Sequence, residues 1–285
     1  MLDSFFISRR WHVTKTTKKP MPMQPQWGGR YWWGSDHDTW SSYPRTGSPH
    51  STRSVFILHA SHKQVAGLNI MIIDMHNHST KSDDGRAKVE NYCQWIRSRD
   101  LPIDGIVLTE HRQFEPTDYG ALSSKYGLVI LEGSEVETEY GHVLVYGVTE
   151  GMMGEFDFER VDNPLADVLA AADKHGAIAA PCHPGRPKVG MFAHTEEYGK
   201  PEGVKIVEVY NGGSRDDEDQ IALDNAEEAG YLGIAGSDAH IVSHIGRCAT
   251  RFPHHIGSMG ELVEALGAGE FEAVTFKNHR GTSTI

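Results

Sequence analysis

Short apolar runs alternate with amphipathic segments along residues 70–276. Runs of this kind, bounded by turn residues, are typical of buried strands. The predicted strands are residues 70–74, 104–110, 127–137, 142–148, 176–183, 204–211, 232–238 and 271–276. The predicted helices are residues 86–99, 163–176, 216–230 and 259–269. This alternation favours a parallel sheet covered by helices, and seven or eight such units suit a small α/β barrel better than an open sheet.

The helical segments carry end signals. In residues 163–176, Asn163 is the expected N-cap, Pro164 takes the first helical position and Gly176 ends the helix. In residues 86–99, three apolar side chains repeat at helical spacing on one face. These are Val89, Cys93 and Ile96.

The chain divides into two parts of different character. Residues 1–54 have clustered Pro, Gly and Ser and show neither a strand nor a helix period. Residues 1–70 carry a net charge of +6, whereas residues 71–285 carry −18. We therefore expect a low-order extension over 1–70 and a catalytic domain over 71–285. The extension is a disordered tail, a targeting peptide, or sequence upstream of a true start at Met71.

Composition limits the function classes. The acidic domain argues against an extended nucleic-acid surface, which needs a basic footprint, although a local basic spot or a metal cluster can still hold a phosphate. No apolar run reaches the length of a membrane-spanning helix. The three cysteines are sparse and lack CxxC spacing, which indicates a reducing compartment; we expect a cytoplasmic protein.

Metal-ligand side chains follow six of the predicted strands. They are His76 and His78; Glu110 and His111; Glu135; His183; Glu208 and Asn211; and Asp238 and His240, while His142 opens a strand. In a barrel the carboxyl ends of parallel strands meet at one face, where active sites lie. His76 and His78 point the same way because they are two residues apart on an extended chain.

The donor types favour a cluster of divalent cations. A carboxylate such as Glu135 can bridge two ions, which a neutral imidazole cannot. A mixed His, Asp and Glu set without thiolates suits Zn²⁺, Mn²⁺ or Fe²⁺. Bound cations would also reverse the local field, so that an acidic domain could bind an anionic substrate.

Five ordered motifs resemble those of the PHP (polymerase and histidinol phosphatase) superfamily. They are "DMHNHSTKSDDG", "LTEH", "EGSEVETEYGH", "CHPGR" and "GSDAH", and the similarity runs from about Met71 to Phe276. The resemblance implies a distorted (β/α)7 TIM-like barrel with two or three divalent ions that hydrolyses phosphate esters.

The resemblance also implies ligand roles. His76, His78, Glu135 and Asp238 would hold one metal. Glu135 would bridge to a second, completed by His142 and His183. Asp83, His111 and His240 would bind a third.

Two positions depart from the usual motifs. Thr109-Glu110-His111 replaces Thr-Asp-His, and the first motif has two aspartates. We expect Asp83 to be the ligand and Asp84 to cap a helix that begins near Arg86.

Several neighbours have expected supporting roles. Asp74 is expected to orient a ring nitrogen, or else simply to end its strand. Cys182 is expected to be a small buried residue, and Glu208 and Asn211 to line the site without binding metal. Arg186 and Arg247 are candidates for phosphate contact, or else ordinary surface charges. Asp238 or a metal-bound water would protonate the leaving oxygen.

The predicted activity is hydrolysis of a phosphomonoester, or of the end phosphate of a nucleotide or oligonucleotide, with histidinol phosphate as an alternative substrate. About thirty residues separate the fourth strand from "CHPGR", which indicates an open site. A C–N amidohydrolase is a second class, but no lysine ends a strand to serve as its carbamylated bridge. A non-catalytic metal-binding accessory module is a third. The sequence indicates no membrane partner and no oligomeric state.

Overall fold

The structure is a computed structural model that describes residues 69–215 and 217–277 of the 285-residue chain. The first described strand begins at Met71, at the predicted start of the catalytic domain. The alternatives for the extension concern residues 1–68, which lie outside the described residues.

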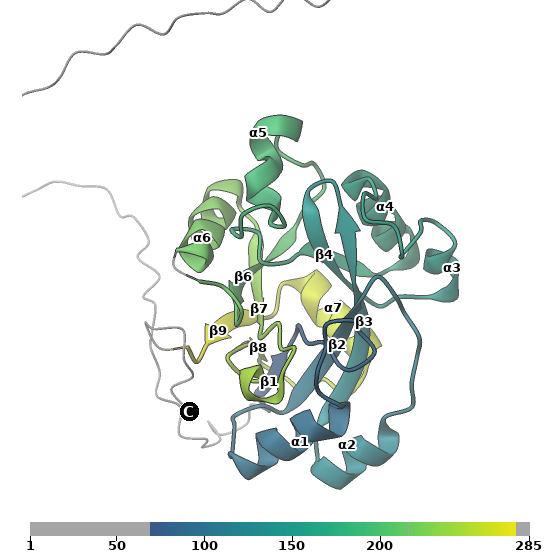
Figure 1. The fold of residues 1–285 in the computed structure, drawn as a ribbon, viewed down its shortest axis with the longest axis vertical. Coiled ribbons are helices and arrows are strands. Elements are labelled where there is room, and N and C mark those ends of the chain that lie inside the picture. The colour runs from purple at the N-terminus through teal and green to yellow at the C-terminus, as the bar shows by residue number, and fades with distance from the viewer. Residues whose placement is uncertain (1–68, 216, 278–285) are drawn as a thin grey trace, which may run out of the picture. The chain divides into compact units, whose positions relative to one another are not determined.

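Strands and helices alternate through the described residues (Figure 1). The strands are β1 Met71–Asp74, β2 Gly105–His111, β3 Val129–Thr138, β4 Gly141–Tyr146, β5 Ile178–Pro181, β6 Ile206–Asn211, β7 Leu232–Gly236, β8 Cys248–Phe252 and β9 Glu272–Thr275. The α-helices are α1 Val89–Ser98, α2 Gly120–Tyr126, α3 Glu150–Met153, α4 Leu165–His175, α5 Thr195–Tyr198, α6 Glu218–Ala229 and α7 Met259–Ala268. Two 3₁₀ turns, η1 Met191–His194 and η2 Val242–His244, complete the list.

All eight predicted strands are present, and the predicted α/β class is confirmed. Strand β8 was not predicted, because its sequence "CATRF" places Thr250 and Arg251 inside the run and interrupts the apolar pattern. The Thr250 hydroxyl has a specific partner, since it bonds the backbone of Ala235 on β7. A tertiary contact therefore explains a polar residue that hides the strand.

The sheet is mixed rather than parallel throughout. Seven strands are hydrogen-bonded in the order β5-β4-β3-β2-β1-β8-β9, and β6 and β7 form a separate parallel pair. The pairs β1–β2 and β2–β3 are parallel, whereas β3–β4, β4–β5, β1–β8 and β8–β9 are antiparallel.

The sheet curls so that the β6–β7 pair lies against β5 on one side and β8 on the other. Among residues 69–215 and 217–277, however, the backbone ladder does not close into one ring. The structure thus supports a curled half-barrel, and a complete (β/α)7 barrel is not seen. The close approach of β7 to β1 requires Gly236, since a Cβ there would lie 2.4 Å from the Cβ of His76.

The antiparallel β3–β4 hairpin decides where His142 lies. A two-residue turn reverses the chain, and Glu137 pairs with His142 in the register. The start of β4 therefore lies at the same edge as the carboxyl end of β3. His142 joins the strand-end residues although it opens its own strand.

The helix predictions were close at the ends. Gly176 ends α4 in the left-handed conformation, as expected. Asn163 is not the cap, because the N-cap position falls on Pro164 and the Glu139 carboxylate accepts the backbone N–H of Leu165 instead. The Asn163 side chain donates to the backbone carbonyl groups of Glu137 on β3 and of Asp157 and Arg160 in the loop before α4.

A buried apolar core supports the carboxyl ends of the strands. On α1, Val89, Cys93 and Ile96 are buried together, as their spacing predicted. The fully buried Tyr92 places its hydroxyl 2.7 Å from the carbonyl oxygens of both His78 and Ala239. This contact ties α1 to the loops that follow β1 and β7.

Across the part of the chain that the structure describes, no helix has both the length and the apolar character needed to cross a membrane.

Candidate metal centre

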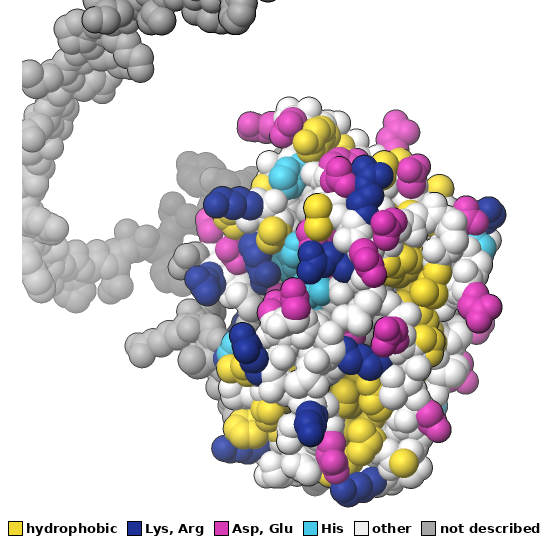
Figure 2. All heavy atoms as spheres, turned by 45° about the vertical axis from the view of Figure 1, so that its right-hand side comes forward, with side chains coloured by type: hydrophobic (Ala, Val, Ile, Leu, Met, Phe, Trp, Pro, Cys, Tyr) yellow, Lys and Arg dark blue, Asp and Glu magenta, His cyan; other side chains and the backbone are white. Residues whose placement is uncertain are grey.

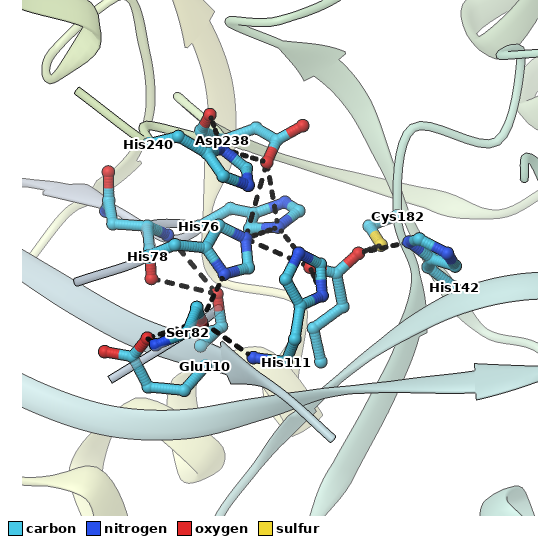
Figure 3. A network of polar contacts seen from close by, with 12 residues as sticks. His76, His78, Ser82, Glu110, His111, His142, Cys182, Asp238 and His240 are labelled. Atoms are coloured by element: carbon cyan, nitrogen blue, oxygen red, sulfur yellow. Dashed lines mark hydrogen bonds and ion pairs between the residues drawn. The ribbon is translucent and has the colours of Figure 1, made fainter. Parts of the chain in front are cut away.

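The predicted histidines and carboxylates meet at one edge of the sheet (Figure 3). They come from the ends of β1, β2, β3, β5 and β7 and from the start of β4. Those brought together are His76, His78, His111, Glu135, His142, His183, Asp238 and His240. Only Asp83 of the predicted ligands lies elsewhere.

Glu135 is the centre of the cluster. Its side chain is fully buried and contacts five imidazole rings. Its two carboxylate oxygens face different rings. Oε2 lies 3.0 Å from Nε2 of His76, 3.0 Å from Nε2 of His78 and 3.3 Å from Nδ1 of His111. Oε1 lies 2.7 Å from Nδ1 of His142 and 3.3 Å from Nε2 of His183. This division suits a carboxylate that bridges two cations.

The donor set fits a divalent ion. The Nε2 atoms of His76 and His78 lie 3.0 Å apart, and each is 3.0 Å from Glu135 Oε2. Two imidazole nitrogens and a carboxylate oxygen at this spacing repel one another unless a proton or a metal ion lies between them. Nitrogen and oxygen donors of this kind suit Zn²⁺, Mn²⁺ or Fe²⁺.

The electrostatics of the cluster also favour a cation. Burial alone would lower the pKa of His78, but hydrogen bonds to Asp238 and Glu135 outweigh it and raise that pKa to about 9. Burial would likewise raise the pKa of Glu135, but the histidines around it, His76 first, hold it well below its usual range. Without metal, these carboxylates therefore favour protonation of His76, His78 and His142, whose pKa values are raised.

Glu208 holds the His76 ring from behind. Its carboxylate lies 3.1 Å from Nδ1 of His76 and accepts the backbone N–H of His183 and the side-chain amide of Asn211. A carboxylate on the far nitrogen of a ligand histidine is the usual support in metal sites. The expectation that Glu208 and Asn211 line the site is therefore consistent with their positions.

Asp74 does not orient a ring, which corrects the sequence interpretation. Its two oxygens accept the backbone N–H groups of Ser237 and Gly246. Burial outweighs these hydrogen bonds and raises the pKa of Asp74 to about 6. The residue thus joins β1 to both ends of the segment that connects β7 to β8.

Asp238 completes the inner group. Its Oδ1 lies 3.5 Å from Nε2 of His76 and 3.4 Å from Nε2 of His78. Asp238 and His183 both have positive φ angles, 51° and 33°. Non-glycine residues hold this conformation where the surrounding structure enforces it, often at functional sites.

The structure places Asp83 outside the cluster and Asp84 against it. The side chain of Asp83 is 73% exposed, and among the described residues it forms an ion pair only with the guanidinium of Arg112, at 3.4 Å. Asp84 Oδ2 lies 3.0 Å from Nε2 of His240 and 3.5 Å from Nε2 of His111. Asp84 does not cap a helix either, since the N-cap of α1 is Lys88. We therefore propose Asp84, in place of Asp83, as the carboxylate of the third metal position.

A paired substitution checks this assignment. Asp84→Asn is expected to weaken binding of the ion held by His111 and His240 on the order of 10–100-fold. Asp83→Asn is expected to leave this affinity unchanged. The affinity is measured from the metal content, determined by mass spectrometry, after dialysis against a series of Zn²⁺ concentrations. A loss confined to Asp83→Asn would restore the original assignment, and equal losses in the two variants would contradict the preference for Asp84.

The two arginines differ in their contacts. Nη2 of Arg186 donates to Asp238 Oδ2 at 3.1 Å and to Asn211 Oδ1 at 2.9 Å, so its guanidinium borders the cluster. Nη1 of Arg247 donates to the carbonyl oxygen of Gly212, and its buried Nε has no hydrogen-bond partner among the described residues.

Two further residues contact the cluster. Cys182 is buried as expected, but its thiol donates to Glu135 Oε1 at 3.3 Å, so it is part of the surroundings of the site. Ser82 contacts His78 and was not singled out by the sequence, because a serine in a loop carries no metal signal by itself.

The centre reaches the surface. Figure 2 shows histidine side chains on one face of the molecule, with basic and acidic side chains close around them. The side chains of His240, His142 and His111 are 28%, 19% and 14% exposed, whereas those of His76 and His78 are fully buried. A substrate can therefore reach the outer rings while the inner ones stay dry.

Comparison with known proteins gives one family model and several solved structures. A family model described as PHP-associated matches residues 218–271. No curated protein sequence matches the chain.

Solved structures share the fold. One is a two-domain protein from Bacteroides vulgatus containing a predicted PHP-like metal-dependent phosphoesterase, with 20% identity and a TM-score of 0.50 over 74% of this chain and 66% of that chain. Another is a lesion-specific endonuclease from Pyrococcus furiosus, with 16% identity and a TM-score of 0.52 over 72% of this chain and 57% of that chain. A complex of endonuclease Q with a 27-mer duplex has 15% identity and a TM-score of 0.51 over 70% of this chain and 57% of that chain.

The chain thus spans less than two thirds of these proteins. The shared fold and the family model together confirm the predicted resemblance to the PHP superfamily.

Proposed function

We propose that this protein is a metal-dependent phosphoesterase. The observation that carries the proposal is the Glu135 carboxylate, whose two oxygens face separate groups of histidines. When bound there, two or three divalent cations would supply a water of lowered pKa as nucleophile and positive charge for the phosphoryl oxygens. The nine proposed ligands are His76, His78, Asp84, His111, Glu135, His142, His183, Asp238 and His240.

Arg186 is the proposed phosphate contact. Asp238 and Asn211 hold one nitrogen of its guanidinium at the border of the cluster. The remaining N–H groups of the planar fork suit two oxygens of a phosphoryl group. Arg247 is the second candidate, because its buried Nε has no partner among the described residues.

Asp238 suits the role of ligand better than that of proton donor. Burial would raise its pKa, but His76 and the other rings around it hold that pKa well below its usual range. A carboxylate held ionised in this way does not carry a proton to the leaving oxygen near neutral pH. A water molecule is the better source of that proton.

The proposed substrate is a phosphomonoester or the end phosphate of a nucleotide or oligonucleotide. Endonuclease Q, which shares the fold, has been solved with an abasic DNA lesion at its active site, so phosphodiesters belong in the substrate panel. Histidinol phosphate stays an alternative. The amidohydrolase class is less well supported, because a glutamate and not a lysine stands at the bridging position.

His183→Ala is expected to lower the turnover of an aryl phosphate by at least about 100-fold, because it removes a ring that faces the bridging carboxylate. The assay compares the full chain loaded with Mn²⁺ or Zn²⁺ on aryl monoesters, aryl diesters and nucleotides. His254→Ala is a matched control, because His254 is an exposed histidine near Glu270 on the surface. The proposal fails if the metal-loaded wild type hydrolyses none of these esters.

A further inference from the structure

Glu110 is a buried residue next to the cluster. Its carboxylate contacts none of the proposed metal ligands directly. It is 5% exposed, and its partners are the serines of the loop after β1. The hydroxyl groups of Ser79 and Ser82 donate to its two oxygens at 2.5 and 2.6 Å. The backbone N–H groups of the same two residues donate as well, at 3.1 Å. With four donors the carboxylate acts only as an acceptor.

The Ser82 hydroxyl therefore has its hydrogen atom committed to Glu110. Two more groups contact the hydroxyl oxygen of Ser82: the backbone N–H of His111 at 3.0 Å and Nδ1 of His78 at 3.2 Å (Figure 3). A hydroxyl has one donor and two acceptor sites. Since its donor is used and the His111 N–H fills one acceptor site, the third partner has to be a donor.

We propose that Glu110 and Ser82 form a positioning pair that holds His78 with its hydrogen on Nδ1. The opposite ring nitrogen, Nε2, is then the one with a free lone pair, and it is the nitrogen that faces Glu135 and Asp238. The chain of contacts runs from the Glu110 carboxylate through a serine hydroxyl to the ring. This inference rests on the proposed metal centre.

His76 provides an internal comparison. Its Nδ1 faces the Glu208 carboxylate directly, without a serine between. The two rings of the HxH motif thus have separate supports, one from β6 and one from the end of β2. The glutamate in "TEH" gives the second support.

The first test is the nitrogen that binds metal. In wild-type protein with ¹⁵N-labelled histidine and bound Zn²⁺, long-range ¹H–¹⁵N spectra should show His78 with hydrogen on Nδ1 and metal on Nε2. In Ser82→Ala the His78 Nδ1–H signal should shift and exchange faster with solvent, while that of His76 stays unchanged. A wild-type spectrum with metal on Nδ1 of His78 would overturn the inference without any variant.

The second test is Zn²⁺ affinity, measured by competition with a chromophoric chelator. Ser82→Ala should lose on the order of 10–100-fold, the usual effect of removing the partner of a ligand histidine. Ser79→Ala is the matched control, because Ser79 donates to the same carboxylate but contacts no ring, and it should lose less than about threefold. Equal losses would mean that Glu110 only clamps the loop, which contradicts the inference.

These readouts need no substrate. If Zn²⁺ binds as described and no ester is hydrolysed, the proposed function fails and the positioning pair stands. If the wild type binds no Zn²⁺, both fail.

Discussion

Replacing Glu135 with glutamine is expected to reduce hydrolysis of an aryl phosphate by about 1,000-fold or more, the upper range for loss of a group that organises transition-state charge. The physical reason is the position of the carboxylate, which lies within 3.3 Å of five rings. A neutral amide cannot bridge two cations, and its NH₂ group would face nitrogens that need their lone pairs for metal. Bound metal should fall with activity.

Glu137→Gln is the control for this experiment. Glu137 lies two residues further along β3, and its carboxylate forms an ion pair with Arg112 at 3.5 Å. Among the described residues it forms no ion pair with a cluster histidine, and its charge contributes less than that of Glu135 to the raised pKa of His142. Its metal content and turnover should stay within about threefold of the wild type, since a partly exposed pair contributes little. Full metal occupancy in Glu135→Gln, measured by mass spectrometry, would contradict the bridging role.

The second large effect is on stability. Metal-free protein should become less stable as the pH rises from about 6.5 through 9. Burial would lower the pKa of His78, but hydrogen bonds to Asp238 and Glu135 raise it to about 9, and the pKa values of His76 and His142 are raised as well. A group with a raised pKa stabilises the fold while it is protonated in the folded state, and that contribution is lost as pH rises through the folded value.

The opposing groups act outside this window. Burial lowers the pKa values of His111 and His183, so their effect appears below the ordinary histidine value of about 6.5. The raised pKa of Asp74, about 6, acts between about 4 and 6. Between 6.5 and 9 the protein should therefore lose stability on the order of 3 kcal/mol from His78 alone.

Urea unfolding of chelator-treated protein at several pH values measures this change. With Zn²⁺ present the trend should reverse, because protons compete with the metal for the same rings and binding strengthens as pH rises. The loaded protein should be the more stable one at pH 8. A metal-free stability that is flat or rising from pH 6.5 to 9 would contradict the electrostatic description of the cluster.

Much of this site could be predicted without coordinates, because its donors are tied to strand ends. Chemistry-bearing residues follow the apolar runs at β1, β2, β3, β5, β6 and β7, and parallel strands bring such ends together. That the side chains of His76 and His78 point the same way follows from the two-residue period of an extended chain alone. Local sequence also predicted Gly176 as the end of α4, since a glycine is favoured where the helix stops.

Other features depend on contacts between distant segments. β8 is hidden in the sequence because Thr250 bonds across to Ala235 on β7, which no local pattern shows. Strand β4 runs antiparallel to β3 because a short turn reverses the chain between them. The hydrophobic period alone does not show in which direction a strand runs. The curl of the sheet likewise depends on how the β6–β7 pair meets β5 and β8.

The sequence by itself determined which residue types gather at the metal edge, because hydrophobic period and strand order are local properties. The tertiary structure decided which of two adjacent aspartates faces His240, which carboxylate supports His76, and that Glu110 reaches His78 through Ser82. Each of these choices depends on the direction of a side chain in a loop or across strands. A difference of one residue reverses that direction without changing the composition of the motif.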